Sequence, residues 1–114
     1  MNVRATTRET NGVVIVDFSG RITLGEGSAM LRAIIRELLA KGQKRIVLNL
    51  AEVNYIDSSG IGELVSGYTT ARNQGGQLKL LNLTRKVHDL LQITRLFTVF
   101  EVFTEESAAI ASFG

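Results

Sequence analysis

The chain has 114 residues, the usual size of one domain, and we expect residues 1–114 to form a single domain. It contains no cysteine and one histidine, His88, so disulfides, thiolate metal sites and multi-histidine metal sites are excluded. The formal net charge is +2 and the basic residues are scattered, which argues against nucleic acid as the main partner.

The first part of the sequence predicts a β-hairpin. Val3–Glu9 is rich in β-branched residues and is expected to form an edge strand. Asn11-Gly12 is a strong two-residue hairpin signal because both positions tolerate positive φ. Val13–Phe18 is almost continuously apolar, which suits a strand covered on both faces, and Ser19-Gly20 is expected to end it.

Helices and strands then alternate. After a loop at Leu24–Gly27, Ser28 is a candidate N-cap for a helix whose apolar residues recur every three or four positions as far as Leu39. The sequence predicts the remaining elements as a strand at Arg45–Leu50, a six-residue loop, a helix ended by Gly75-Gly76, a strand at Leu78–Leu83, a short helix capped by Thr84, a strand at Val99–Phe103 and a C-terminal helix starting at Thr104.

The predicted order is β-β-α-β-α-β-α-β-α. It indicates an α/β fold with a mixed, mostly parallel sheet that begins with an antiparallel hairpin. In such sheets functional sites gather beyond the carboxyl ends of the strands. The polar run Asp57-Ser58-Ser59-Gly60 falls there, between the third strand and the second helix. A helix start stabilises an anion, including a phosphate carried by a serine, but the same residues also serve as plain helix caps.

Other chemistries fit the sequence less well. The nucleophile elbow G-x-S-x-G is absent around Ser58, and His88 is expected to be a surface or half-buried residue rather than a triad base. Gly25-Glu26-Gly27 begins like a dinucleotide fingerprint, but Met30 occupies the place of its third glycine, and no phosphate-binding G-x-x-x-x-G-K-[ST] motif occurs. We therefore predict no enzyme activity, no catalytic residue, no metal site and no cofactor.

The stretch IVLNLAEVNYIDSSGIGELVSGY (46–68) resembles the STAS domain family, and within it the stand-alone anti-sigma factor antagonists of bacteria. Its D-S-[S/T]-G-[I/L]-G motif is fairly specific. VVIVDFSGRI (13–22) and GGQLKLLNLTRKVHDLLQITRLFTVFEVF (75–103) support the resemblance, which extends over nearly the whole chain.

The resemblance implies a STAS-like fold and a regulator that switches partners. Its partners would be an anti-sigma factor that is also a serine protein kinase, and a PP2C-type phosphatase. The resemblance implies that the kinase phosphorylates Ser58 and that the unphosphorylated protein binds the kinase. Glycines 60 and 62 would then leave room for the kinase to approach. The expected partner-binding residues are Asn54, Tyr55, Asp57, Ser59, Gly60, Ile61, Gly62 and Glu63.

Alternatives within the same fold stay open. The chain would then be a non-switching STAS scaffold, or a small subunit of a stress-signalling complex or of a lipid or anion transporter. A nucleotide-binding sensor is a further alternative. We expect a cytoplasmic location, because the N-terminal residues lack a secretory signal and no run reaches the roughly twenty apolar residues of a membrane span. A weak homodimer also stays open, because the apolar residues Ala108–Phe113 can pack on their own sheet or on a neighbouring molecule.

Overall fold

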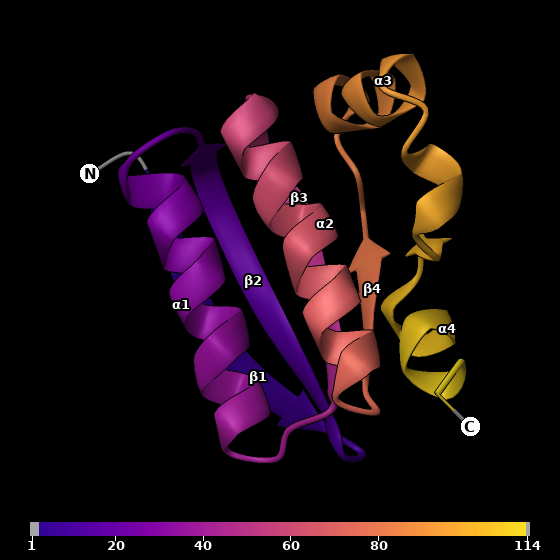
Figure 1. The fold of residues 1–114 in the computed structure, drawn as a ribbon. Helices are drawn as coiled ribbons and strands as arrows, with labels where there is room; N and C mark the ends of the chain where they lie inside the picture. The colour runs from indigo at the N-terminus through magenta and orange to yellow at the C-terminus, as the bar shows by residue number, and fades with distance from the viewer. Residues whose placement is uncertain (1–2, 114) are drawn as a thin grey trace.

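The computed structural model describes residues 3–113, which form a sheet with helices packed on it (Figure 1). The elements are β1 (Val3–Thr10), β2 (Val13–Ile22), α1 (Glu26–Ala40), β3 (Arg45–Ile56), α2 (Ser58–Asn73), β4 (Gln77–Leu81), α3 (Arg85–Ile93), a 3₁₀ turn η1 (Phe97–Val99), β5 (Val102–Phe103) and α4 (Glu106–Ala111). The strands lie in the order β1-β2-β3-β4-β5. β1 and β2 are antiparallel and the other neighbours are parallel. The predicted fold class and element order are confirmed.

The predicted hairpin forms at the predicted turn. Asn11 and Gly12 have φ values of 52° and 78°, so both central positions are left-handed. Such a turn matches the right-handed twist of the strands that it joins. The pairing runs without interruption from Thr10 opposite Val13 to Val3 opposite Gly20.

The two faces of the sheet are covered differently. α1 and α2 lie side by side on one face, where the main core contains buried residues of β2, β3 and β4, such as Val14, Leu48 and Leu80 (Figure 1). On the other face, a smaller cluster joins Ile15 and its neighbours to Ala109 of α4. Because β2 contributes to both clusters, its almost continuous apolar sequence is explained as predicted.

Two strands are longer than predicted. β2 continues past Ser19-Gly20 to Ile22, and β3 continues through the expected loop to Ile56. The two extensions pair with each other, with register irregularities after Asp17 and after Gly20. The backbone N–H and C=O groups of each extension therefore find hydrogen-bond partners in the other, so the strands continue although polar residues interrupt their apolar pattern. As a result, the chain enters α2 directly from a strand.

The first helix begins earlier than predicted, so Ser28 is not its N-cap. The cap residue is Gly25, whose φ of 101° is a conformation that glycine adopts without strain. Ser28 lies in the first turn with 4% of its surface exposed, and its N–H donates to the carbonyl of Thr23 at 3.0 Å. Its buried hydroxyl has no hydrogen-bond partner among the described residues.

Three predictions near the C-terminus also need correction. The strand expected at 99–103 is limited to β5, because Val99 ends a 3₁₀ turn and the Phe100 ring packs edge-on against Tyr68, with ring centroids 5.4 Å apart. β4 ends at Leu81 because Asn82 has a φ of 59°. Thr84 precedes α3 but does not cap it with its side chain, because its hydroxyl donates to the carbonyl of Val53 at 2.9 Å.

The C-terminal helix packs on its own sheet. Ala109 is fully buried, and Ile110 and Phe113 pack partly buried against the same cluster. The helix begins at Glu106 rather than at Thr104. These apolar residues thus pack against the sheet of their own molecule, which leaves less apolar surface for contact with a second copy of the chain.

Candidate functional site

Asp57 joins three elements at the end of β3. It occupies the N-cap position of α2, and its Oδ1 accepts a hydrogen bond from the N–H of Gly60 at 2.9 Å. Its Oδ2 accepts one from the N–H of Leu24 at 3.0 Å, in the loop between β2 and α1. Its own N–H donates to the carbonyl of Ile22 at 3.3 Å. Asp57 therefore fixes the start of α2 against the end of β2.

These hydrogen bonds determine the charge of Asp57. The N–H of Gly60, and next that of Leu24, hold the pKa of the carboxyl below its ordinary value because they stabilise the ionised form. At neutral pH Asp57 is therefore a carboxylate, with both oxygens engaged by backbone groups. Its negative charge also lies beside the positive end of the α2 dipole.

Ser58 and Ser59 follow in the first turn of α2. Ser58 is exposed and Ser59 is partly exposed. Within residues 3–113 neither hydroxyl takes part in a side-chain hydrogen bond, whereas Asp57 carries out the capping. Capping therefore accounts for Asp57 but not for the two serines. The exposed hydroxyl of Ser58 is accessible to an enzyme that transfers a group onto it.

Two residues expected to contact a partner are instead part of the fold. Ile61 is 6% exposed and belongs to the main core. Gly60 is buried, and a Cβ on it would meet the backbone carbonyl of Ile22 and would lie 2.5 Å from Cγ1 of Ile56. Glycine at position 60 is thus required by close packing inside the molecule. Gly62 differs, because a Cβ there would meet nothing within 4 Å.

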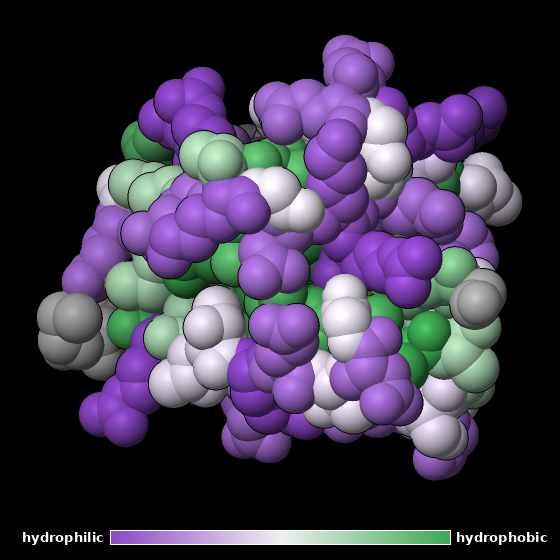
Figure 2. Space-filling view, turned by 90° about the horizontal axis from the view of Figure 1, so that it is seen from below, coloured by the Kyte–Doolittle hydropathy of each residue, from purple (hydrophilic) through white to green (hydrophobic). Residues whose placement is uncertain are grey.

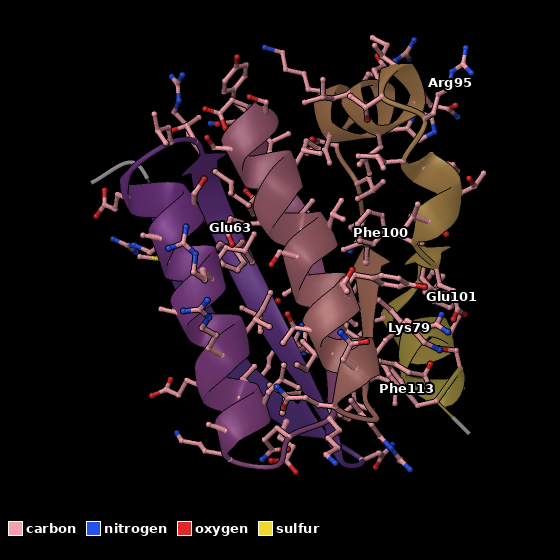
Figure 3. The ribbon with its side chains drawn as sticks, in the orientation of Figure 1. Glu63, Lys79, Arg95, Phe100, Glu101 and Phe113 are labelled. Atoms are coloured by element: carbon pink, nitrogen blue, oxygen red, sulfur yellow. The ribbon has the colours of Figure 1, made fainter. Side chains whose placement is uncertain are left out.

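The other expected contact residues lie at the surface. Asn54 is exposed, and two cations lie over the ring of Tyr55: the guanidinium carbon of Arg21 at 5.0 Å and the Nζ of Lys86 at 5.8 Å from its centroid. The carboxylate of Glu63 receives two hydrogen bonds from the guanidinium of Arg32 in α1, at 2.9 and 2.5 Å. Figure 3 shows Glu63 on the side of α2 that faces α1, so its ion pair connects the two helices.

His88 lies apart from the serines. Its ring packs edge-on against Phe97, with centroids 4.7 Å apart, and its Nδ1 is 3.4 Å from a carboxylate oxygen of Asp89. No hydrogen bond between described residues joins it to Ser58 or Ser59. Among residues 3–113, no three acidic or histidine side chains gather as a metal-binding group. None of the helices in this range has the length and apolar composition needed to span a bilayer.

One exposed residue beside the site was not predicted. Leu24 is 79% exposed although it is strongly apolar, and its N–H is bonded to Asp57. The signal was present in the sequence, since an isolated leucine in a loop with two glycines has no obvious place in the core. A cavity of about 390 Å³, lined by Tyr68, Arg72 and Glu101 among others, lies near the other end of α2 and has no contact with Ser58.

Comparison with known proteins identifies the family of this chain. The model of the STAS domain matches residues 4–109. An anti-sigma F factor antagonist of Paenibacillus polymyxa is 30% identical over 96% of this chain and 94% of the relative. An anti-sigma-B factor antagonist of Bacillus subtilis is 24% identical over 96% of this chain and 99% of the relative. The chain belongs to the STAS domain family.

A solved structure agrees with the fold. The phosphorylated form of the Bacillus cell fate determinant SpoIIAA superimposes with a TM-score of 0.75, covering 97% of this chain and 100% of the other. The two sequences are 20% identical, so the likeness establishes the shared fold. Together with the family match and the two relatives above, it confirms the predicted resemblance to stand-alone anti-sigma factor antagonists.

Proposed function

We propose that this protein is an anti-sigma factor antagonist that switches partners according to the phosphorylation of Ser58. The unphosphorylated protein binds an anti-sigma factor that is also a serine kinase, and thereby frees a sigma factor. Phosphorylation of Ser58 by that kinase ends the binding, and a PP2C-type phosphatase restores it. The names of the relatives in Paenibacillus polymyxa and Bacillus subtilis support the first part of this proposal.

The observation that carries the proposal is the division of roles between Asp57 and Ser58. Asp57 caps α2 with both carboxylate oxygens in use, while the hydroxyl of Ser58 is exposed and unused. A phosphate on Ser58 would add roughly −1.5 to −2 charges at the first helical position. The unpaired N–H groups and positive dipole of the helix start favour such a charge. The fold therefore tolerates the phosphate without rearranging.

Release follows from the same charge. A partner packed over the start of α2 would enclose the phosphate dianion and the Asp57 carboxylate. Leaving a buried charge unpaired costs about 3–5 kcal/mol. That penalty corresponds to a weakening of roughly 100- to 1,000-fold or more. Gly62 belongs to this proposed contact surface with Asn54, Tyr55 and Ser59, because all of them have exposed surface at this end.

The test is phosphorylation by each anti-sigma-type serine kinase of the host, followed by phosphopeptide mapping. Wild-type protein and the matched control Ser59→Ala are expected to take up one phosphate on Ser58, and Ser58→Ala none. Ser58→Ala is expected to bind the kinase and never to be released by ATP. If no kinase binds the wild type and Ser58 stays unmodified in native cells, the chain is a non-switching scaffold or transporter subunit instead.

The proposal makes the chain a regulator rather than an enzyme, acting in the cytoplasm, where kinase, phosphatase and sigma factor meet. It assigns no cofactor and no nucleic acid to this chain. A serine hydrolase would need a base beside Ser58, and His88 makes its contacts elsewhere. Hydrolytic turnover that disappears in Ser58→Ala would contradict this part of the proposal.

A further inference from the structure

Large apolar side chains are exposed around Ser58. Within residues 3–113 four large hydrophobic residues are notably exposed: Leu24, Tyr55, Ile93 and Val99. Leu24 is bonded through its N–H to Asp57, and Tyr55 is three residues before Ser58. Ile93, the last residue of α3, is 77% exposed. Figure 1 shows α3 and the start of α2 at the same end of the molecule, beyond the carboxyl ends of the strands.

The opposite end of the molecule has a different surface. Figure 2 views that end and shows hydrophilic residues over much of it, with apolar residues in a band between them and at the sides of the view. Single exposed apolar residues are ordinary on protein surfaces, whereas a contiguous exposed apolar patch marks an interaction site. Three of the four exposed residues, Leu24, Tyr55 and Ile93, belong to the end that carries Ser58.

Two of these three residues line an open pocket, which we call the α3 pocket. It is formed by Tyr55 and Ile56 at the end of β3 and by Lys86, Asp89, Leu90 and Ile93 of α3, with a volume of about 270 Å³. Its aliphatic and aromatic residues leave an apolar floor that the protein itself does not cover. The space suits one or two apolar side chains of another molecule rather than a whole cofactor.

Cations border this pocket. Arg21 and Lys86 lie over the Tyr55 ring, and neither forms an ion pair among the described residues. The acidic residue of the pocket, Asp89, lies 3.5 Å from Arg85 and 3.4 Å from His88. The charge available to a partner is therefore positive. A partner surface with carboxylates around an apolar side chain would complement it.

We propose that the α3 pocket and Leu24 anchor the anti-sigma factor on the two sides of Ser58. The partner inserts an apolar side chain into the pocket against Ile93 and places carboxylates near Lys86 and Arg21. This inference rests on the proposed function and adds to it the partner chemistry and the residues that hold the partner. The pocket is continuous with the site, since Tyr55 and Ile56 immediately precede Asp57 in β3.

The anchor and the switch then have separate effects. Ser58 sets whether the complex persists, whereas Ile93 and Lys86 set its affinity and its choice of partner. A few buried apolar anchors usually carry most of the binding energy of an interface. Loss of the anchor should therefore weaken docking without changing the transfer of phosphate once the complex has formed.

The experiment uses the full chain and each anti-sigma-type serine kinase of the host, purified separately. Binding of wild type, Ile93→Ala, Ile93→Asp and Lys86→Glu is measured by calorimetry, with Val99→Ala and Lys41→Glu as matched controls. Val99 is exposed but lies outside the pocket, and Lys41 follows α1 at the other end. Urea unfolding of every variant confirms that the fold is kept, as expected for exposed positions.

We expect Ile93→Ala and Lys86→Glu to weaken binding tenfold or more, Ile93→Asp to weaken it further, and both controls to change it less than threefold. In the kinase assay, Ile93→Ala should raise KM for phosphorylation of Ser58 and leave kcat unchanged. If wild type is bound and phosphorylated but the pocket variants behave like it, this inference is overturned while the proposed function stands. If no kinase binds wild type, the proposed function itself fails.

A second copy of the chain is the competing occupant of the pocket. Analytical sedimentation of the free protein distinguishes a second copy of the chain from the anti-sigma factor as the occupant. A concentration-dependent dimer that Ile93→Asp converts to monomer would overturn the inference, because the pocket would then be filled by the protein itself. A monomer at all concentrations, together with weaker kinase binding by Ile93→Asp, supports it.

Discussion

Two glycines, two residues apart in α2, should respond oppositely to the same added methyl group. At Gly60 a Cβ would meet the Ile22 carbonyl and lie 2.5 Å from Cγ1 of Ile56, so backbone must shift. Overpacking of this kind costs typically about 1–3 kcal/mol, and a fixed carbonyl places it near the upper end. Replacing glycine in a helix returns about 0.5–1 kcal/mol. Gly60→Ala should therefore destabilise the fold by about 2 kcal/mol.

At Gly62 the same change should stabilise the fold. A Cβ would meet nothing within 4 Å, and the residue is exposed in the helix. Only the helix gain of about 0.5–1 kcal/mol remains. The two variants should thus differ by about 3 kcal/mol, or on the order of 10 °C in Tm for a domain of this size.

Urea unfolding at pH 7 measures both variants against wild type, with the slope m expected to stay constant. The close packing of α2 on β2 would be refuted if Gly60→Ala and Gly62→Ala had the same midpoint. Kinase binding adds a second readout. Gly62→Ala should bind more weakly although its fold is more stable, if position 62 lies under the partner as proposed.

Two further predictions concern ionic contacts. Arg8 holds the pKa of Asp17 and the pKa of Glu106 below their ordinary values, so the stability from these pairs is complete above about pH 4.5 and is lost as the pH falls through the lowered values. Urea midpoints at pH 7, 4 and 2.5 should therefore fall less in Arg8→Met than in wild type. Equal falls in the two proteins would contradict the assignment of these ion pairs. Lys79 is buried and donates to the Oγ and carbonyl of Ser112 at 2.8 and 3.2 Å, beside Glu101 and Phe113 (Figure 3). Lys79→Met should therefore lower the free energy of unfolding by about 1–2 kcal/mol and speed amide exchange in α4. Unchanged exchange would show that Lys79 does not hold α4.

The sequence predicted the fold because its signals were local. The Asn11-Gly12 turn, the apolar run of β2 and the three- and four-residue spacing of α1 each specify an element without reference to the rest of the chain. The extension of β3 to Ile56 was not predictable in this way, because polar residues break its apolar pattern and its partner is the end of β2, some thirty residues earlier.

The site was predicted in position but not in the role of each residue. The spacing of the motif located the start of α2, and capping chemistry singled out Asp57. Sequence alone does not tell how deeply each residue of the first turn is buried, so Gly60 and Ile61 were expected among the partner-binding residues, and both lie in the interior. Ile93 was missed because an apolar residue at the end of a short helix normally belongs to the core.

The most direct test compares the affinity of the anti-sigma factor kinase for two preparations of this protein, one unphosphorylated and one fully phosphorylated on Ser58. Calorimetry with ADP in place of ATP prevents further transfer during the measurement. We expect binding of the unphosphorylated form and a weakening of at least about 100-fold for the phosphorylated form, because of the cost of an unpaired buried charge. Equal affinity of the two forms would contradict this expectation.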